Sequence, residues 1–434
     1  MRERIAARRR FARLRDHSGE GELTDLSDAT VDLIIIGGGI IGGSVLYHLA
    51  QLGYPGRVLV LEREDALSKG STALSAGGFR NIWTTPINMR LTSYSIKKLA
   101  AFQDELRFPI GFDQRGYLFC QYEENFESAK AYGAEWAKNG VAIEFLDAAG
   151  VEAKVPGLRA SVDHIDPEVN EILQMKPIAG GVFGPECGSF DPSAAAQGYF
   201  ERGLEGFDGR AELRLNATVK KVRITDGEYR GVEMADGSFI ESGRIVVAAG
   251  AWTNQLLELS GLAGDDLPPV IPLNRMLFIT NMPPIDGFER IPMTIIDNGV
   301  YFRPEGPNLM IGRADPKTHA GFDTTPDAKY YEEQINYYMQ ERIPGMERCR
   351  LMSMWGGLYD TNAVDHNAVL GEHPHAENLI FATGFSGHGA MESPAAGLAL
   401  SELIHYGEYR TLDCAPLSIR RFWENKPIHE MIVI

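Results

Sequence analysis

Apolar residues predominate in two short segments near the start of the chain, with continuous runs at 33–36 and 58–61, which predicts buried strands. Residues 31–36 (VDLIII) and 57–62 (RVLVLE) are of strand length, and residues 40–52 between them are predicted to form a helix that stops at Gly53. A strand, a helix and a second strand in this order form a right-handed crossover. The pattern therefore predicts a parallel sheet at the start of an α/β fold.

Alternation of apolar and polar residues replaces these runs in the middle of the chain. Residues 211–252 alternate around Asp-Gly turns at 226–227 and 236–237, which predicts a meander of short antiparallel strands that ends in a buried strand at 245–249. Further short strands between 269 and 313 predict a second antiparallel sheet, which would roof a substrate pocket.

Helical periodicity predicts three more helices, at 92–106, 123–139 and 327–342. Residues 378–404 then repeat the order of the opening segment, with a strand, a glycine-rich turn and a helix. No clear linker separates these patterns. Because 434 residues exceed what one simple core organises, we expect two domains that are interleaved in the sequence.

The composition narrows the classes of function. The net charge of −17 argues against a nucleic-acid binder, although a locally basic pocket for an anionic substrate stays compatible with it. The cysteines lie far apart and form no C-x-x-C pair, which argues against a metal site or a disulfide framework: Cys120, Cys187, Cys349 and Cys414. The longest apolar runs are of strand length, so we expect a soluble, cytoplasmic protein without a membrane span.

Residues 1–30 differ from the rest of the chain, because they begin strongly basic and end acidic and polar. They lack the apolar stretch of a secretory signal, and Glu3 and Asp16 do not suit a transit peptide. We expect a basic N-terminal extension that is frayed or lies on the domain as a short helix. Peripheral membrane association through this segment is the alternative interpretation.

Three glycines after the first predicted strand, Gly37, Gly39 and Gly42, form a G-x-G-x-x-G motif. The motif follows a strand and opens a helix, which is the context in which it binds a dinucleotide. Its backbone can approach a pyrophosphate closely, and the helix N-terminus favours the negative charge. Glu62 ends the second strand, where a carboxylate can accept hydrogen bonds from ribose hydroxyls.

Small-residue turns elsewhere would converge on the same ligand, which suits FAD better than NAD: GSTALSAGGFR (70–80), VVAAGAW (246–252) and ATGFSGHGA (382–390). Together with VLVLERE, CGSFDPSAAAQGYF, NATVKKV, GVYFRPEG and GLYDTNAVDHNAVLG, they make the sequence resemble the D-amino-acid oxidase superfamily of FAD-dependent oxidoreductases over residues 31–407. The resemblance is to the branch of sarcosine oxidase, glycine oxidase and dimethylglycine dehydrogenase. Residues 70–94 also resemble a subgroup that contains a mitochondrial respiratory-complex assembly factor.

The resemblance implies an α/β fold in which a Rossmann-like, glutathione-reductase-type FAD-binding domain is interleaved with a mostly antiparallel substrate domain. We expect the FAD-binding domain to comprise residues 31–105, 180–262 and 360–412. The substrate domain would comprise 106–179 and 263–359, and residues 413–434 would form a C-terminal tail.

The resemblance also implies which residues hold FAD. The glycine motif would bind the pyrophosphate with Ser71 and Thr72, Glu62 and Arg63 the adenosine end, and the turn at 384–389 the flavin ring. The complete set implied for the cofactor is Gly37, Gly39, Ile40, Ile41, Gly42, Glu62, Arg63, Ser71, Thr72, Ser75, Ala76, Gly77, Gly78, Val219, Ala249, Gly250, Trp252, Gly384, Phe385, Ser386, Gly387, His388 and Gly389.

Five residues are candidates for the substrate side. Arg80 aligns with an arginine that pairs with the substrate carboxylate in sarcosine oxidase, and a structural ion pair is its alternative role. His388 would donate a hydrogen bond to flavin or substrate, or be structural. Tyr301, Arg303 and Tyr359 would line the pocket from the roof sheet, or be ordinary packed residues of a strand.

The sequence departs from the family pattern at positions that matter for chemistry. Met391 and Met310 stand where sarcosine oxidase has lysines, one of which promotes the reaction with oxygen. Leu74 stands where dimethylglycine-dehydrogenase-like members attach FAD through a histidine, and Cys349 is poorly placed for the cysteine linkage of other members. These departures imply non-covalent FAD and favour a dehydrogenase over an oxidase.

The resemblance therefore implies FAD-dependent oxidation of the C–N bond of an amino acid with a secondary or tertiary (N-alkyl) amine, followed by hydrolysis of the imine. The electron acceptor, a quinone, an electron-transfer protein or O2, stays open, as does assembly into a homo-oligomer. Three alternatives remain: an oxidase that uses O2, an FAD-containing assembly or scaffold protein with little turnover, and a dehydrogenase of hydroxy acids or polyol phosphates.

Overall fold

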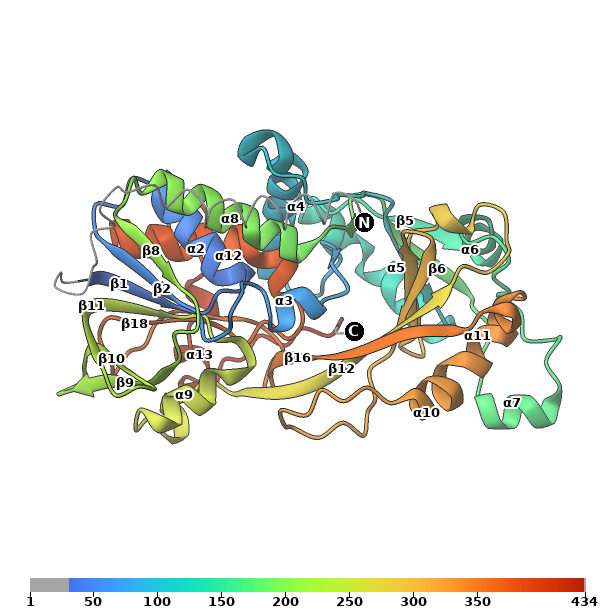
Figure 1. Cartoon of the computed structure of the whole chain (residues 1–434). Helices are drawn as coiled ribbons and strands as arrows, with labels where there is room; N and C mark the ends of the chain where they lie inside the picture. The colour runs from blue at the N-terminus through green and yellow to red at the C-terminus, as the bar shows by residue number, and fades with distance from the viewer. Residues whose placement is uncertain (1–30, 433–434) are drawn as a thin grey trace. The chain divides into compact units, whose positions relative to one another are not determined.

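The computed structural model describes residues 31–432, and two sheets of eight strands organise this part of the chain (Figure 1). The fold is of the predicted α/β class. The extension expected at residues 1–30, together with its suggested membrane association, lies outside the described residues. No helix within residues 31–432 is long and apolar enough to cross a membrane.

The first sheet is built on the apolar segment that opens the described chain. The order of its strands is β17-β18-β11-β1-β2-β8, and all neighbours in this order are parallel except β17 and β18. The predicted parallel sheet is thus confirmed. The six strands in this order are β1 (Val31–Ile36), β2 (Val58–Leu61), β8 (Ala211–Arg214), β11 (Phe239–Val247), β17 (Val369–Glu372) and β18 (Leu379–Thr383), and the sheet is completed by two strands, β9 and β10, that lie outside it.

Three helices cover one face of this sheet (Figure 1), namely α2 (Ile40–Gln51), α8 (Pro192–Gly206) and α12 (Gly389–Tyr406). Small residues let α2 and α12 approach closely, since a Cβ on Gly397 would lie 2.1 Å from the hydroxyl oxygen of Ser44. That hydroxyl donates to the carbonyl of Ser393 at 2.6 Å. The contact fixes the two helices that follow the two predicted glycine-rich turns.

The meander predicted for residues 211–252 is wrong at its start. β8 is not part of it, because β8 pairs in parallel with β2 at the edge of the first sheet. Only β9 (Val219–Thr225), β10 (Glu228–Met234) and the first half of β11 are antiparallel. β11 then continues without a break into the parallel sheet, and its buried residues 245–247 belong to the buried strand predicted at the end of the meander.

The second sheet has the order β16-β12-β15-β14-β13-β4-β6-β5 and is mostly antiparallel, with one parallel pair between β13 and β4. The antiparallel strands expected between 269 and 313 are confirmed, and the long β16 adds to them. The strands are β4 (Tyr117–Gln121), β5 (Glu144–Asp147), β6 (Gly180–Gly184), β12 (Val270–Asn281), β13 (Met293–Ile296), β14 (Tyr301–Glu305), β15 (Asn308–Gly312) and β16 (Leu351–Asn362).

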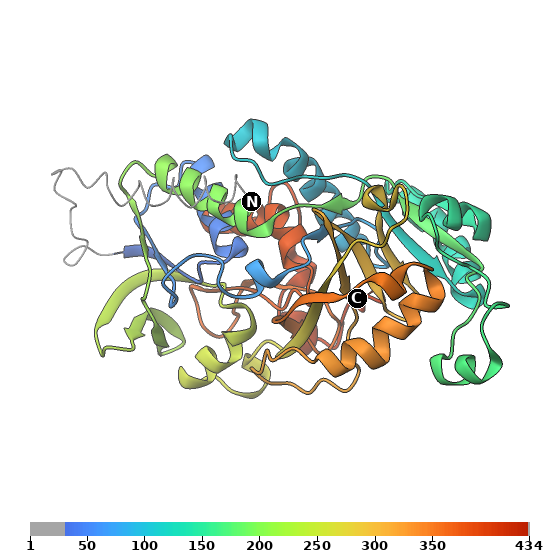
Figure 2. The ribbon, with the colours of Figure 1, turned by 45° about the vertical axis from the view of Figure 1, so that its right-hand side comes forward.

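A helical segment lies against this sheet, visible in orange in Figure 2. It comprises α10 (Ala328–Tyr330), a π-helical turn (Tyr331–Asn336) and α11 (Tyr337–Arg342), so the helix expected at 327–342 is confirmed with a π turn inside it. Tyr331 and Met339 are buried in one cluster with Phe278 of β12 and Phe302 of β14.

The predicted domain boundaries stay predictions. β6 opens the stretch 180–262 but pairs within the second sheet, and β16 runs across the boundary at 359/360. The remaining elements are α3 (Ser71–Leu74), β3 (Gly78–Phe79) with its partner β7 (Gly188–Ser189), α4 (Pro86–Leu106), α5 (Glu123–Lys138), α6 (Ala148–Lys154), α7 (Pro167–Leu173), α9 (Thr253–Leu259) and α13 (Arg420–Trp423). α4 begins six residues before the helix predicted at 92, with Pro86 in its first turn.

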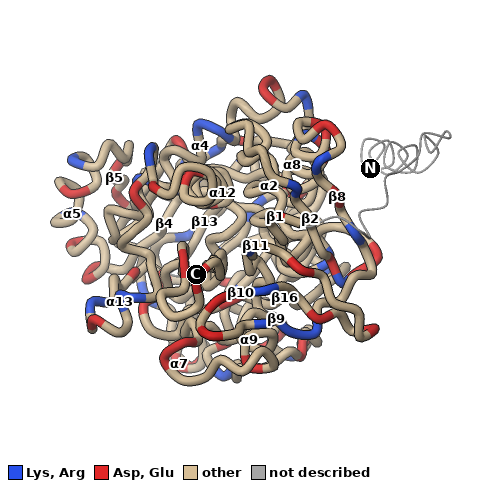
Figure 3. Tube along the Cα trace, turned by 90° about the vertical axis from the view of Figure 1, so that its left-hand side faces the viewer, with Lys and Arg blue, Asp and Glu red and all other residues tan. Residues whose placement is uncertain are grey.

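Acidic and basic residues are interspersed over the outer elements of the described chain (Figure 3). Most of the ion pairs that they form are exposed, as between Lys69 and Asp65 or between Arg290 and Glu289. Such pairs contribute little to stability. The stability of the fold must therefore come mainly from the burial of apolar strands, such as β2, whose four residues are all buried.

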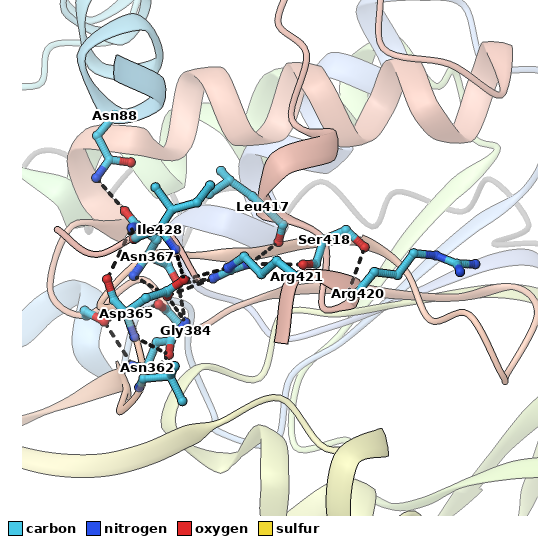
Figure 4. Close-up of polar contacts among 12 residues, drawn as sticks. Asn88, Asn362, Asp365, Asn367, Gly384, Leu417, Ser418, Arg420, Arg421 and Ile428 are labelled. Atoms are coloured by element: carbon cyan, nitrogen blue, oxygen red, sulfur yellow. Dashed lines mark hydrogen bonds and ion pairs between the residues drawn. The ribbon is translucent and has the colours of Figure 1, made fainter. Parts of the chain in front are cut away.

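A buried ion pair anchors the C-terminal residues. Arg421 of α13 donates to both carboxylate oxygens of Asp365, at 2.7 and 3.0 Å, and to the carbonyl of Asn367. The same carboxylate accepts from the backbone N–H of Ile428 at 3.0 Å. Figure 4 shows Arg421 pointing into this cluster, whereas its neighbour Arg420 points away.

Glu430 makes a second anchor at the start of α4. Its buried carboxylate accepts hydrogen bonds from the backbone N–H groups and the hydroxyls of Thr84 and Thr85, at 2.7 to 3.2 Å. The predicted C-terminal tail is therefore packed into the molecule, and it brings Ile432 next to the predicted site residue Arg80.

Candidate functional site

The glycine motif forms a tight turn between β1 and α2. Gly37 has φ +119°, and a Cβ there would lie 2.3 Å from the carbonyl oxygen of Ala248, just beyond β11. A Cβ on Gly42 would lie 2.2 Å from the carbonyl oxygen of Gly37. Both positions need glycine, so that the turn can lie directly against the carboxyl end of the neighbouring strand.

The N-terminus of α2 opens onto this turn. Gly39 is its N-cap and supplies no side chain, and the hydroxyl of Thr72 accepts from the N–H of Ile40 at 3.1 Å. The first N–H groups of a helix need acceptors and carry partial positive charge, which makes this end suitable for a phosphate.

Glu62 follows β2 beside the glycine turn. Its carboxylate accepts from the N–H of Gly38 at 2.6 Å and from that of Glu64 at 2.8 Å. Next to it, the guanidinium of Arg63 lies 3.9 Å from the centre of the Trp252 ring, within cation–π distance. This group forms one end of a cavity.

The cavity has a volume of about 450 Å³ and runs from Glu62 and Trp252 past the glycine turn to the β12–β16 pair. Seventeen of the residues predicted for the cofactor line it: Gly37, Gly39, Ile40, Ile41, Glu62, Arg63, Ser71, Thr72, Ser75, Ala76, Val219, Ala249, Gly250, Trp252, Phe385, Gly387 and Gly389. The turns that the sequence predicts to converge therefore do converge.

Six of the predicted cofactor residues do not line the cavity: Gly42, Gly77, Gly78, Gly384, Ser386 and His388. Several of them shape the wall instead. Gly77 has φ +68° and packs against the carbonyl of Phe190, and the hydroxyl of Ser386 accepts from the N–H of Asn362 at 3.0 Å.

Asp360 holds the second glycine-rich turn in place from the end of β16. Its carboxylate accepts from the N–H groups of Gly384 at 2.8 Å and of Phe385 at 3.2 Å. Burial raises the pKa of this carboxyl to about 6, although these N–H groups act in the opposite direction. Gly387 has φ +90° and lies flat on the ring of Tyr359, where a Cβ would be 2.2 Å away.

The far end of the cavity is lined by Arg275 and Leu277 of β12, Tyr301 of β14 and Tyr359 of β16. The two tyrosines were predicted for the substrate side, and the structure brings them together here. Burial raises the pKa of each phenol, so both hydroxyls are protonated and able to donate.

Arg80 is buried outside the cavity lining. Its Nη1 donates to the carbonyl of Ile82 and its Nη2 to that of Ile432, both at 2.6 Å, and its guanidinium lies 3.5 Å from the centre of the Trp83 ring. Desolvation lowers the pKa of this guanidinium. The role predicted for Arg80 in carboxylate binding stays a prediction.

Arg303 and His388 also have protein partners. Arg303 donates to the carbonyl of Ala76 through Nε and Nη2, at 3.0 and 2.7 Å, and pairs with Glu305 at 2.7 Å. His388 packs edge-on against Trp83, and burial, with Arg80 and His366 nearby, lowers its pKa well below the usual value. Neither side chain lines the cavity, and their predicted catalytic roles stay predictions.

Comparisons with known proteins agree with this arrangement. Residues 32–403 match the DAO family, described as FAD dependent oxidoreductase. The chain belongs to this family. It is therefore an FAD-dependent oxidoreductase, and the predicted family is confirmed.

The relatives of this DAO-family chain include enzymes and a protein named only by its domain. This chain is 30% identical to FAD-dependent oxidoreductase domain-containing protein 1 of Xenopus laevis, over 94% of this chain and 86% of that protein. It is 24% identical to mitochondrial sarcosine dehydrogenase of Homo sapiens, over 92% of this chain and 42% of that protein. The crystal structure of L-proline dehydrogenase from P. horikoshii matches with a TM-score of 0.78 and 26% identity, over 92% of this chain and 99% of that one.

The residues present fit the cofactor of the DAO family. The turn between β1 and α2 leaves no room for a Cβ and ends in a helix N-terminus whose N-cap, Gly39, supplies no side chain, which suits the pyrophosphate. Glu62 and Trp252 would hold the adenosine end, and the turn fixed by Asp360 the flavin end. When bound there, FAD supplies a two-electron acceptor.

The positions at which this chain departs from the family pattern lie in three different surroundings. Met310 and Met391 are both buried in the apolar cluster that contains Leu277 and Tyr301. Leu74 lines the cavity and packs against Gly357, while Cys349 packs in the cluster under the second sheet.

Sequence reasoning missed Arg275, Asp360, Glu392 and Glu430. A signal existed for Arg275, because it is a charged residue within the apolar strand IPLNRMLFIT. Glu392 lies in the first turn of α12 and is buried; its burial and the charges of Glu430 and Asp360 raise its pKa to about 8, against the effect of Arg80. Nothing local in the sequence indicates that burial.

Proposed function

We propose that this protein oxidises the C–N bond of an amino acid with a secondary or tertiary (N-alkyl) amine. One observation carries the proposal: the cavity that starts at the glycine turn continues to an end lined by two tyrosines and an arginine. That end offers apolar walls, hydroxyl donors and a positive charge, which suit a small amine that carries a carboxylate. Sarcosine and L-proline, named in two of the matched proteins, are both secondary amino acids.

In the proposed reaction the carbon next to the nitrogen of the substrate would be oxidised by two electrons, for which FAD, held by the glycine turn after β1 and by the turn fixed by Asp360, would be the acceptor. The resulting imine takes up water and divides into an amine and a carbonyl compound. The protein's part is to orient the C–N bond and to exclude water, which the rings of Tyr301 and Tyr359 suit. A neutral amine needs no dedicated base for this step.

We propose a dehydrogenase with non-covalently bound FAD, which passes its electrons to a quinone or an electron-transfer protein. The buried residues Met310 and Met391 support a dehydrogenase, because neither supplies the positive charge that favours reduction of O2. Leu74 supports non-covalent binding, since its side chain has no atom able to form a bond to flavin.

The second candidate is an FAD-containing assembly or scaffold protein with little turnover. It is favoured by Arg80, the residue that sequence analysis assigned to the substrate carboxylate, because its guanidinium is bonded to the carbonyls of Ile82 and Ile432. A buried structural arginine would serve a protein that no longer turns over a substrate.

Anaerobic reduction of the purified flavoprotein tests these proposals. N-alkyl amino acids such as N-methylglycine and proline are added, and the visible flavin absorbance is followed; we expect bleaching by this class and not by hydroxy acids. Slow return of colour after air is admitted, without hydrogen peroxide, would support the dehydrogenase. Fast return with peroxide would show an oxidase, and a flavin that no member of the panel reduces would contradict the proposed reaction and favour the second candidate.

A further inference from the structure

Arg275 lies in the middle of β12, opposite Gly357 of β16, where the strand passes the far end of the cavity. Because the facing residue is a glycine, no side chain of β16 at that position covers it. Its guanidinium lies 5.3 Å from the centre of the Tyr359 ring, and Tyr301 lines the same end.

The guanidinium of Arg275 is incompletely satisfied. Nη1 donates to the carbonyl of Asn274 at 3.2 Å, whereas Nε is buried and has no hydrogen-bond partner. Within residues 31–432, no carboxylate lies within ion-pair distance of this side chain. The remaining donors of Nη1 and Nη2 are therefore left for a ligand, and the edge between these two nitrogens can donate to the two oxygens of a carboxylate.

The other arginines around the site, Arg80, which is buried, and Arg303, which is half-buried like Arg275, differ from it in this respect. Arg80 donates to the carbonyls of Ile82 and Ile432. Arg303 donates to the carbonyl of Ala76 and forms an ion pair with Glu305. A buried donor without an acceptor destabilises a fold, and a buried charge without a partner does so more strongly. An anionic ligand that enters the cavity would supply the partner that the half-buried charge of Arg275 lacks.

We propose that Arg275 binds the carboxylate of the substrate, with the ring of Tyr359 behind the guanidinium and the hydroxyl of Tyr301 at the same end of the cavity. This inference rests on the proposed function for the identity of the substrate. It names a different residue from Arg80, and it fixes the end of the cavity at which the carboxylate lies.

The test measures binding of simple carboxylates to the FAD-loaded protein by isothermal titration calorimetry. Propionate and benzoate are compared with propionamide and benzamide, which have the same shape without the charge. The wild-type protein is expected to bind each acid about 10- to 100-fold more tightly than its amide, because two charge-assisted hydrogen bonds are at stake. Arg275→Met should abolish this preference, and Arg275→Lys should retain only part of it, since an ammonium group is not a planar fork.

The matched control is Arg348→Met, which removes the same charge at an exposed position outside the cavity and should leave the preference unchanged. Flavin content and thermal unfolding of every variant are recorded. Should Arg275→Met fail to retain FAD, Arg275→Lys decides alone, and a preference equal to that of the wild type would overturn the proposal. Arg80→Met is measured beside them, because loss of the preference there with Arg275→Met unaffected would assign the carboxylate to Arg80.

Two further outcomes are informative. If the wild-type protein does not distinguish acids from amides, the inference about Arg275 is wrong whatever the protein oxidises. If the preference depends on Arg275 but no amine reduces the flavin, the carboxylate site stands and the proposed reaction fails.

Discussion

The two ends of the cavity are built from different parts of the polypeptide. At the cofactor end the wall is mostly backbone and small residues, brought together where β1, β11 and β18 end. At the substrate end the wall consists of large side chains, namely Arg275, Tyr301 and Tyr359, on strands of the other sheet. The shape of the cofactor end therefore depends on where the backbone can turn. The chemistry of the substrate end depends on the hydrogen-bond and ion-pair partners of each side chain.

This difference determines what distant segments can do. The glycine turn is held by its own neighbours in β1, α2 and β11, so it depends little on the C-terminal residues. The guanidinium of Arg80, by contrast, has one of its two carbonyl acceptors in the tail, 352 residues away along the chain. Residues that never touch a ligand can therefore decide which arginine faces the substrate.

The largest effect is expected from the buried ion pair that anchors the tail. Arg421→Ala leaves the carboxylate of Asp365 buried with neither of its guanidinium donors, and loss of one partner of such a pair lowers the free energy of unfolding by about 3–5 kcal/mol. Chemical denaturation measures this loss. The matched variant is Arg420→Ala, at the neighbouring exposed position, which should change stability by less than about 0.5 kcal/mol.

Equal stability of these two variants would show that the tail is not anchored through Arg421. The comparison of the two ends predicts a further result. Arg421→Ala should retain FAD at low denaturant concentration, because none of the contacts around the glycine turn involves the tail. Loss of FAD in parallel with loss of the anchor would contradict the independence of the cofactor end.

A smaller effect on stability, but a direct one on the cofactor, is expected at the glycine turn. Gly42→Ala places a methyl group 2.2 Å from the carbonyl oxygen of Gly37, and such overpacking costs about 1–3 kcal/mol. We expect FAD affinity to fall about 10- to 100-fold, measured as the ratio of flavin to protein absorbance after dialysis. Gly321→Ala is the control, since nothing lies within 4 Å of a Cβ there; full FAD content in both variants would contradict the close approach.

The same difference between the two ends explains which parts of the structure could be predicted from the sequence. The order of strand, glycine turn and helix at residues 31–51 is local, because the periods of the apolar residues and the position of Gly37 suffice to predict it. The pairing of β8 with β2 is not local, and the alternation of residues 211–214 does not distinguish it from a meander. Strand partners depend on which edge of the sheet is free after folding.

The side chains of the substrate end could be predicted only as candidates. Arg80, Arg303 and Arg275 are equally polar in the sequence, but the first two find carbonyl acceptors on segments far away, and Nε of the third finds none. The resemblance to the family made Arg80 the leading candidate for the substrate carboxylate, because a resemblance assigns a role to a residue by its aligned position. It carries no information about the acceptors that a tail such as residues 428–432 supplies.

The smallest expected effect is a dependence of stability on pH that arises from one buried carboxyl group. Glu392 is buried near Arg80, Glu430 and Asp360, and burial is the main reason why its pKa rises from 4.5 to about 8. Between these values the folded protein binds a proton that the unfolded chain has released, so stability falls as pH rises, by about 1.4 kcal/mol per pH unit. Glu392→Gln keeps a neutral side chain at all pH values and should remove this slope between pH 5 and 8.

The measurement is urea denaturation at pH 6 and 7, with Glu408→Gln as the exposed control that should keep the slope of the wild-type protein. A slope in Glu392→Gln as steep as that of the wild type would assign the pH dependence to other groups, of which Asp360, with its pKa of about 6, is the nearest. The two are distinguishable, because Asp360 holds Gly384 and Phe385. Its ionisation would alter the flavin spectrum, whereas that of Glu392 would alter stability alone.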